Sequence, residues 1–199
     1  MAEIGAILLA AGLSRRMGPQ NKLLLPIAAR PMILHVAQTY LSAIDGTLTV
    51  VVGHEANAVR AALSDLPLNM VENPDFADGQ PTSVAAGLRH APEADLLLIG
   101  LGDQPQLTPA DIKGLIAAHK SADLTKISIP VQGDVRGNPI LIPAWLRPRL
   151  LEDPDRPGCM HFIRKHPEHV QRLTLSAAGF FADIDTPEVY ADVQMTMPT

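Results

Sequence analysis

Apolar runs of strand length alternate with segments of helical period through the first 120 residues of the chain. We expect strands at residues 4–11, 47–52, 68–71 and 95–101. We expect helices at residues 31–43, 55–63 and 83–90, and another that Thr108 caps, with Pro109 and Asp111 in its first turn. Such alternation favours a parallel sheet with helices on both faces, which binds ligands at the carboxyl ends of its strands.

In the last 80 residues strands and helices alternate less regularly, but the sequence still predicts both. We expect strands at residues 126–131, 139–142, 170–175 and 180–184. We expect helices at residues 144–151 and 159–165, and a last one capped at Thr186. A chain of 199 residues suits one domain, so we interpret residues 1–199 as a single unit.

Composition and charge exclude several classes of protein. The apolar fraction is 47% and the charged fraction 19%, which is typical of a globular chain. A net charge of −5 excludes a strongly basic nucleic-acid coat, and 4% aromatic residues disfavour single-strand binding by base stacking. Cys159 is the one cysteine, so there is no intramolecular disulfide and no four-cysteine metal site. No apolar segment approaches about 18 residues, and the apolar N-terminus lacks a basic leader. We expect a cytoplasmic protein without nucleic-acid or membrane partners.

The loop after the first predicted strand combines small residues with cations. Gly12 and Gly18 allow the loop to turn, and Ser14, Arg16 and Lys22 lie beside backbone amides that a ligand can approach closely. Arg15 adds a further cation. This chemistry favours an anionic, polyphosphate ligand, with a solvated basic loop as the alternative. The spacing matches neither a Walker loop nor the dinucleotide Gly-x-Gly-x-x-Gly fingerprint.

Carboxylates follow two other predicted strands. Asp103 comes directly after residues 95–101, where it could bind a hard cation or simply satisfy the amides of a turn. Asp183 and Asp185 lie two residues apart and would share one face of a strand. Alternatively, Asp185 or Thr186 caps the last helix. The residues alone leave both questions open.

These motifs together resemble those of the molybdenum cofactor nucleotidyltransferases, and more narrowly the cytidylyltransferase branch. The most specific match is Leu9-Ala10-Ala11-Gly12 with Ser14, Arg16, Met17, Gly18, Asn21 and Lys22. Weaker matches follow in the family's order at residues 73–83, 102–105, 136–139 and 183–188, so the resemblance covers nearly the whole chain. It implies a three-layer α/β/α, Rossmann-like fold of the nucleotide-diphospho-sugar transferase type, with a mixed, mostly parallel sheet. The half up to about residue 120 would bind the nucleotide and residues 121–199 the acceptor.

The resemblance also implies a reaction and a set of site residues. CMP would pass from CTP to the terminal phosphate of molybdopterin, with release of pyrophosphate. Arg16, Lys22 and Asp103 would be catalytic, and Asp103 and Asp185 would bind Mg²⁺. The residues implied to bind the nucleotide are Leu9, Ala10, Ala11, Gly12, Ser14, Arg16, Lys22, Asn73, Gly79 and Ser83. The pair Ala10-Ala11 is typical of the branch that uses CTP. A molybdenum hydroxylase or its maturation factor would be a natural protein partner.

Two departures from the family pattern lie in the half implied to bind the acceptor. Asn138 stands where cytidylyl relatives often have His, and residues 152–159 differ from their usual Gly-Asp-x-Gly-Ala-Arg stretch. Three alternatives therefore stay open. The first is a nucleotidyltransferase that uses another phosphorylated acceptor, such as a sugar phosphate, or GTP. The second is a protein that binds and delivers a nucleotide or cofactor without turnover. The third is a flavin- or nicotinamide-dependent oxidoreductase, which the missing dinucleotide fingerprint disfavours.

Overall fold

One mixed sheet forms the centre of the molecule, and both halves of the chain contribute strands to it. The computed structural model describes residues 2–18, 20–153 and 158–197. The strands are β1 (Ile4–Ala10), β4 (Leu48–Val52), β5 (Asn69–Glu72), β6 (Leu96–Leu101), β7 (Ile127–Gln132), β8 (Val135–Arg136), β9 (Ile140–Pro143) and β10 (Val170–Thr174). Their order is β10-β7-β9-β6-β1-β4-β5, with β8 also paired to β7. Only β8 and β9 run antiparallel to their neighbours in this sheet. The expected α/β architecture with a mostly parallel sheet is confirmed.

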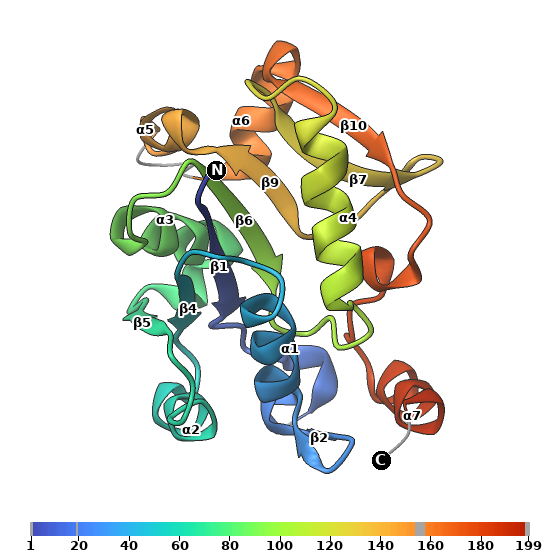
Figure 1. The fold of residues 1–199 in the computed structure, drawn as a ribbon. Coiled ribbons are helices and arrows are strands. Elements are labelled where there is room, and N and C mark those ends of the chain that lie inside the picture. Colours follow the sequence, from blue (N-terminus) through green and yellow to red (C-terminus); the bar gives the residue numbers. More distant parts are fainter. Residues whose placement is uncertain (1, 19, 154–157, 198–199) are drawn as a thin grey trace.

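Helices cover both faces of the sheet, and each face has its own apolar core (Figure 1). One face packs against α1 (Met32–Leu41), α2 (Ala56–Ala62), α4 (Pro109–Lys120) and α7 (Pro187–Thr196). The other packs against α3 (Gln80–His90), α5 (Arg147–Leu150) and α6 (Cys159–Lys165). Along β1 the buried side chains alternate between the two cores, which explains why the central strands are apolar at nearly every position.

The predicted helix starts at Thr108 and Thr186 are confirmed. At α4 the Thr108 hydroxyl accepts from the Asp111 N–H, and the Asp111 carboxylate accepts from the Thr108 N–H. At α7 the Thr186 hydroxyl accepts from the Val189 N–H. Asp185 precedes this cap and is not itself the cap. The predicted helix at residues 144–151 is shorter in the structure, where a 3-10 turn (Ala144–Leu146) precedes α5.

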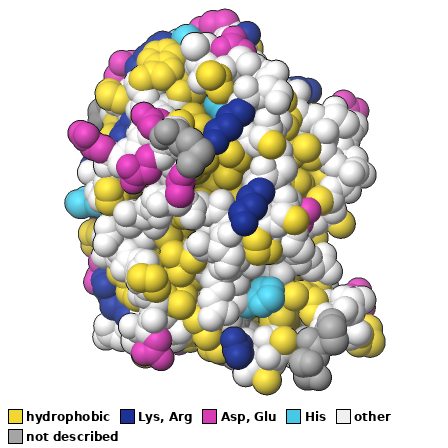
Figure 2. Space-filling view, viewed as in Figure 1, with side chains coloured by type: hydrophobic (Ala, Val, Ile, Leu, Met, Phe, Trp, Pro, Cys, Tyr) yellow, Lys and Arg dark blue, Asp and Glu magenta, His cyan; other side chains and the backbone are white. Residues whose placement is uncertain are grey.

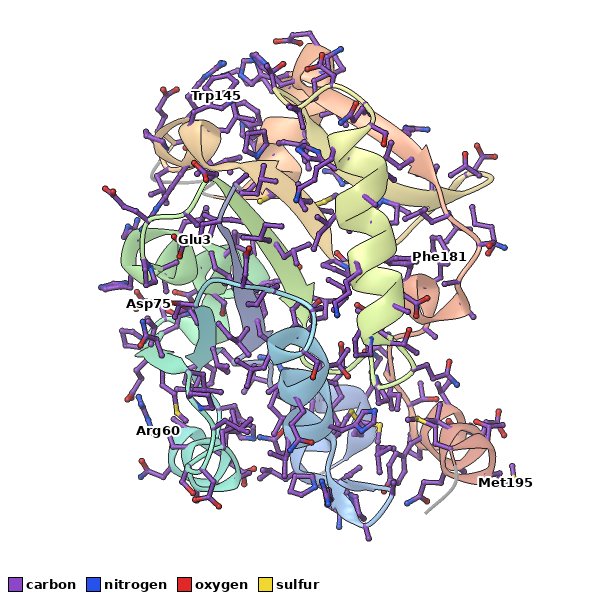
Figure 3. All side chains as sticks on the ribbon, viewed as in Figure 1. Glu3, Arg60, Asp75, Trp145, Phe181 and Met195 are labelled. Carbon is purple, nitrogen blue, oxygen red and sulfur yellow. The ribbon has the colours of Figure 1, made fainter. Side chains whose placement is uncertain are left out.

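The predicted strand at residues 180–184 is wrong. The chain forms a 3-10 turn (Ala178–Phe181) and then an irregular segment beside the first turns of α4, where Phe181 is labelled in Figure 3. Phe180 and Ile184 are buried in the core, which gave the segment its strand-like apolar pattern. The backbone of this segment forms hydrogen bonds with loops and not with a neighbouring strand. The Phe180 carbonyl accepts from the Asn138 N–H, and the Ile184 N–H donates to the Asp103 carbonyl.

Two short strands could not be predicted from the apolar pattern of the sequence, because each has only two residues. A hairpin pairs β2 (Pro26–Ile27) with β3 (Arg30–Pro31), and its turn holds Ala28 and Ala29 at positive φ.

On the face shown in Figure 2, Lys and Arg side chains lie as isolated patches among apolar and acidic ones. Within the described ranges, no helix has both the length and the apolar character that crossing a bilayer requires.

Two glycines give a matched test of packing around β6. An added Cβ at Gly100 would overlap the hydroxyl of Tyr40 and lie 2.6 Å from its Cζ, whereas a Cβ at Gly114 in α4 would meet no atom within 4 Å. Gly100→Ala should therefore destabilise the protein by about 2 kcal/mol or more. Gly114→Ala should stabilise it by about 0.5–1 kcal/mol, because alanine favours the helix. Urea unfolding of both variants measures the difference, and equal effects would contradict this account of β6.

Candidate active site

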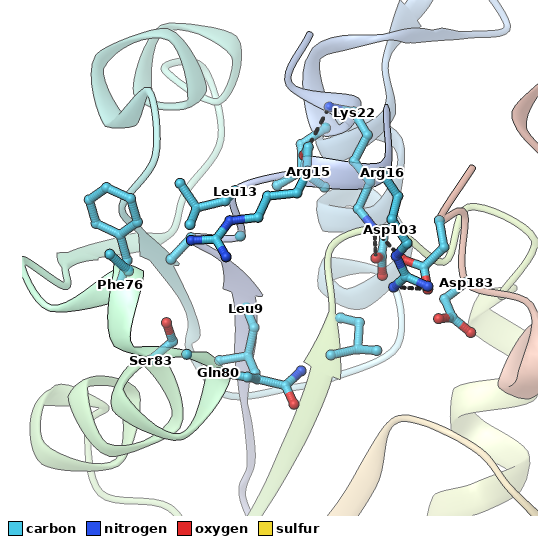
Figure 4. Close-up of a pocket in the computed structure, with 18 residues that line it drawn as sticks. Leu9, Leu13, Arg15, Arg16, Lys22, Phe76, Gln80, Ser83, Asp103 and Asp183 are labelled. Carbon is cyan, nitrogen blue, oxygen red and sulfur yellow. Dashed lines mark hydrogen bonds and ion pairs between the residues drawn. The ribbon is translucent and has the colours of Figure 1, made fainter. Parts of the chain in front are cut away.

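A pocket of about 460 Å³ opens at the carboxyl ends of β1 and β6 (Figure 4). This is the edge at which parallel sheets bind ligands. The loop after β1, the start of α3, the end of β6 and the segment before α7 all contribute to its walls. Its lining residues are Leu9, Ala11, Gly12, Leu13, Ser14, Arg15, Arg16, Lys22, Leu23, Phe76, Ala77, Gly79, Gln80, Ser83, Leu101, Asp103, Asp183 and Asp185.

The loop after β1 closes on itself and presents its backbone to the pocket. Ser14 has a positive φ of 51° and precedes a 3-10 turn (Arg15–Met17), whose Met17 is buried. The Ser14 hydroxyl accepts from the Lys22 N–H at 3.2 Å, which ties the two ends of the loop together. A Cβ at Gly12 would meet no protein atom within 4 Å, so the space beside it is open to a ligand. The hydrogen bond between Ser14 and Lys22 therefore closes the loop beside this open space.

Lys22 links the loop to both carboxylates at one end of the pocket. Its ammonium forms ion pairs with Asp103 and, at 2.9 Å, with Asp185 Oδ1. Arg16 Nη2 pairs with Asp185 Oδ2 at 2.6 Å. Burial lowers the pKa of Lys22, but the charges and hydrogen bonds of the two carboxylates outweigh burial and raise it overall. Lys22 is therefore a permanent cation in this cluster.

Asp183 lies beside this cluster and differs from Asp185 in its electrostatics (Figure 4). Burial, together with the charges of Asp103 and Asp185, raises the pKa of Asp183. Burial also opposes ionisation of Asp185, but Lys22 and Arg16 outweigh it and hold the pKa of Asp185 below its ordinary value of 3.8. Of these two neighbouring carboxylates, Asp185 is the one that holds its negative charge most firmly.

The carboxylates at this end of the pocket suit a hard divalent cation. Asp103 Oδ1 is buried and has no hydrogen-bond partner among the described residues, and an ammonium already lies between Asp103 and Asp185. Within residues 2–18, 20–153 and 158–197, no three acidic, histidine or cysteine side chains are grouped closely enough to hold a metal alone. Mg²⁺ commonly takes one or two carboxylates and completes its shell with water and substrate phosphate. The oxygen donors of Asp103 and Asp185 therefore fit a hard divalent cation that takes its other ligands from elsewhere.

The other end of the pocket is formed by the start of α3, with Phe76 and Ser83 (Figure 4). Gly79 has a φ of 112°, a conformation that side chains disfavour, and it lets the chain turn into α3. Asn73 is buried and donates from Nδ2 to the hydroxyls of Thr82 at 2.8 Å and Ser83 at 3.0 Å. It thereby fixes the first turn of α3 against the pocket.

The structure brings most residues implied by the resemblance to one pocket. Those that line it are Leu9, Ala11, Gly12, Ser14, Arg16, Lys22, Gly79, Ser83, Asp103 and Asp185. Ala10 and Asn73 do not line it: Ala10 faces the core behind, and Asn73 acts through Ser83. Within the departure at residues 152–159, residues 154–157 lie outside the described part of the chain.

The residues that line this pocket but were not among the predicted site residues are Leu13, Arg15, Leu23, Phe76, Ala77, Gln80, Leu101 and Asp183. Asp183 was expected to share one face of a strand with Asp185, but it was assigned no role in binding. Phe76 and Gln80 also line the pocket, and neither has a charge or a spacing that distinguishes it in the sequence. The guanidinium of Arg15 lies between the two ends of the pocket (Figure 4), so the basic loop contributes a further cation there.

Comparisons with known proteins agree with this geometry. Residues 6–170 match the model of the MobA-like NTP transferase domain. The chain is 30% identical to nicotine blue oxidoreductase of Paenarthrobacter nicotinovorans over 190 residues, 93% of each chain. It superposes on a nucleotidyl transferase of Methanothermobacter thermautotroptrophicus with a TM-score of 0.82 and 26% identity, covering 98% of this chain and 97% of that one. Rv0371c of Mycobacterium tuberculosis, solved as a complex with manganese, gives a TM-score of 0.75 at 25% identity and coverage of 98% and 99%.

The fold and the pocket define a nucleotidyltransferase-like protein. The chain belongs to the MobA-like NTP transferase family, because the family model matches well over half of its length. The resemblance that the sequence motifs indicated is thus confirmed at the level of the family.

Removal of the Lys22 ammonium should make stability depend on a divalent cation. Lys22→Met leaves Asp103 and Asp185 facing each other, so we expect a loss of about 1–3 kcal/mol in EDTA. Added Mg²⁺ or Mn²⁺ should restore more stability to this variant than to the wild type. Thermal unfolding with and without metal measures both effects. The control is Lys126→Met, whose ion pair with Asp123 is exposed and 3.8 Å long. An equal metal effect in all three proteins would contradict the cation site.

Neutralising the two neighbouring carboxylates should change stability in opposite directions. The raised pKa of Asp183 means that its charge opposes folding at neutral pH, so Asp183→Asn should stabilise the protein. The lowered pKa of Asp185 means that its charge favours folding above the ordinary value of 3.8, a contribution lost as pH falls through the folded-state pKa. Asp185→Asn should therefore destabilise the protein. Urea unfolding at pH 7 in EDTA compares them, and changes of the same sign would refute the assignment.

Proposed function

We propose that this protein transfers CMP from CTP to the terminal phosphate of molybdopterin and releases pyrophosphate. The observation that carries the proposal is the cation and carboxylate cluster of Lys22, Asp103 and Asp185 at one end of the pocket. A loop with open space beside Gly12 forms the adjoining wall, where a nucleotide could approach the backbone. Family membership supports nucleotidyl transfer as the class of reaction.

Catalysis of this reaction depends mainly on aligning the attacking phosphate with the α-phosphorus and on neutralising phosphate charge. A phosphate monoester is largely ionised near neutral pH, so the attacking group needs no strong general base. Its oxygen would attack the α-phosphorus, and the bond to pyrophosphate would break. Arg16 and Lys22 would bind the triphosphate and stabilise the charge that develops on the leaving pyrophosphate. Asp103 and Asp185 would hold Mg²⁺, which supplies further neutralisation of phosphate oxygens when bound.

The choice of CTP and of molybdopterin rests on the resemblance to the cytidylyltransferase branch. Ala10-Ala11 supports CTP by that analogy, because two alanines have no side-chain group that reads a base. Asn138 and the departure at residues 152–159 lie on the side implied to bind the acceptor. A different phosphorylated acceptor, GTP as the donor, or binding and delivery without turnover therefore remain the alternatives to be tested. A molybdoenzyme or its maturation factor is the protein partner that the proposed product implies.

A second candidate function is that of an oxidoreductase. Its support is the 30% identity, over 93% of both chains, to a relative named nicotine blue oxidoreductase. The chain lacks the Gly-x-Gly-x-x-Gly fingerprint of dinucleotide binding, and the carboxylate pair is better suited to a metal and a triphosphate. We therefore rank nucleotidyl transfer first.

The experiment that separates these functions is a pair of assays on the same preparation. Pyrophosphate release is measured with Mg²⁺ and CTP, GTP or ATP, with and without molybdopterin, and then with sugar phosphates. NADH and NADPH oxidation are followed with a quinone acceptor. Release that requires both CTP and molybdopterin supports the proposal. Nucleotide binding without release from any acceptor favours delivery, and nicotinamide oxidation without release favours the oxidoreductase.

Loss of the Asp103 charge should abolish most of the turnover. We expect Asp103→Asn to lower the rate of pyrophosphate release by about 100-fold or more, because the carboxylate faces the developing charge through the bound cation. The fold should persist, as judged by circular dichroism. Asp192→Asn, an exposed change of the same kind on α7, should keep the wild-type rate. Full activity of Asp103→Asn would remove Asp103 from the mechanism.

A further inference from the structure

The loop that follows β6 is hydrogen-bonded at two points to the segment before α7. Gln104, the residue after Asp103, donates from Nε2 to the Phe180 carbonyl at 3.1 Å. The Asp103 carbonyl accepts from the Ile184 N–H at 2.9 Å. Asp185 follows Ile184 directly, so the two carboxylates that fit a divalent cation lie on either side of this second hydrogen bond.

Two glycines allow the segment before α7 to approach its neighbours closely. A Cβ at Gly179 would lie 2.6 Å from the Leu107 Cα, in the loop after β6. A Cβ at Gly137 would lie 2.6 Å from the Phe180 carbonyl oxygen, which also accepts from the Asn138 N–H at 2.8 Å. Figure 1 shows this segment beside the first turns of α4. Its position is therefore set by direct backbone contacts on two sides.

The side chain of Gln104 is buried, and only one end of its amide has a partner. It is 1% exposed, and its nitrogen faces Phe180 because a carbonyl oxygen can only accept. Its Oε1 is buried and has no hydrogen-bond partner among the described residues. The cost of a buried acceptor without a partner offsets the gain from the single hydrogen bond. The stability of the fold therefore does not account for a glutamine at this position.

The distance between Asp103 and Asp185 matters more for a divalent cation than for Lys22. The Lys22 ammonium is carried by a flexible four-carbon stem, so it can follow carboxylates that move apart. Mg²⁺ instead requires oxygen ligands at about 2.0–2.1 Å in nearly octahedral geometry. A small displacement of the segment before α7 would therefore weaken metal binding and leave the ion pairs of Lys22 largely in place.

We propose that Gln104 is a positioning residue that holds Asp185 at the distance from Asp103 at which both carboxylates bind one divalent cation. Its hydrogen bond to Phe180 fixes the 3-10 turn (Ala178–Phe181) from which the chain continues to Asp185. Gln104 does not line the pocket, so it acts through this turn. The inference rests on the proposed function for the use of the cation in catalysis, whereas metal binding can be measured separately.

The positioning role is tested by Mn²⁺ binding, with free Mn²⁺ measured by electron paramagnetic resonance. Gln104→Met removes the donor and keeps an unbranched side chain of similar size. It should weaken Mn²⁺ binding by about 10-fold or more, the loss typical when a group that orients a metal-binding carboxylate is removed. Circular dichroism should stay unchanged. Equal Mn²⁺ affinity of the variant and the wild type, or a wild type that binds no Mn²⁺, would overturn the proposal.

The matched control is Gln171→Met on β10. The Gln171 Nε2 also donates to a backbone carbonyl, that of Asp123 at 2.8 Å. Gln171 pairs with Ser128 near the start of β7, and β7 runs parallel to β6 because β9 is antiparallel to both. The control therefore lies at the opposite edge of the sheet from Asp103 and should bind Mn²⁺ as the wild type does. An equal loss in both variants would show a general effect of removing a glutamine and would contradict the proposal.

A double-variant cycle tests whether Gln104 acts through Asp185. Asp185→Asn removes one carboxylate and should weaken Mn²⁺ binding by itself. In that background Gln104→Met should add little further loss, because the carboxylate that Gln104 positions is already gone. A full additional loss would overturn a role through Asp185.

The kinetic test is the Mg²⁺ dependence of pyrophosphate release with CTP and molybdopterin. Gln104→Met should raise the Mg²⁺ concentration that gives half the maximal rate by about tenfold and recover most of its rate at saturating Mg²⁺. A rate lowered equally at every Mg²⁺ concentration would indicate general damage and contradict the proposal. If the wild type releases no pyrophosphate with any acceptor, the proposed function fails, whereas Mn²⁺ binding still decides whether Gln104 positions the carboxylates.

Discussion

The ion pairs of Lys22 hold together three parts of the chain that are far apart in sequence. Its ammonium joins the loop after β1 to Asp103 at the end of β6 and to Asp185 before α7. The parallel sheet brings the first two parts to one edge, but it does not specify how the segment near residue 185 reaches that edge. Without a cation between them, Asp103 and Asp185 would repel each other at a site that is mostly closed to water. The pocket therefore needs a positive charge at this point, whether from Lys22 or from a bound metal.

The segment that carries Asp183 and Asp185 reaches the pocket by anchoring and not by strand pairing. Phe180 and Ile184 are buried in the core, and backbone bonds fix the segment to Asn138 and to Asp103. An irregular segment held at both ends can direct neighbouring carboxylates into different surroundings. This explains how Asp185 meets Lys22 and Arg16, while Asp183 meets mainly other carboxylates.

The spacing of apolar residues, together with capping residues, was sufficient to predict the strands and helices that pack against the hydrophobic core. The strands around β1 and β6 and the capped start of α4 follow from local sequence, because each depends on its own burial pattern or its own hydrogen bonds. Residues 180–184 show the limit of that reasoning: buried apolar residues such as Phe180 and Ile184 also occur in an irregular segment whose partners are loops. Tertiary hydrogen bonds of this kind leave no periodic signal in the sequence.

In the candidate site too, residues that lie close together in the sequence could be predicted, whereas roles that depend on tertiary contacts could not. Gly12, Ser14 and Lys22 lie within one loop, so the sequence alone showed small residues beside a hydroxyl and a cation, a combination that favours a polyphosphate ligand. Asn73 illustrates the opposite case, because it is buried behind the pocket wall and acts by orienting Ser83. Only the folded sheet brings Asn73, which follows β5, against the first turn of α3, so no spacing in the sequence marks it as part of the site.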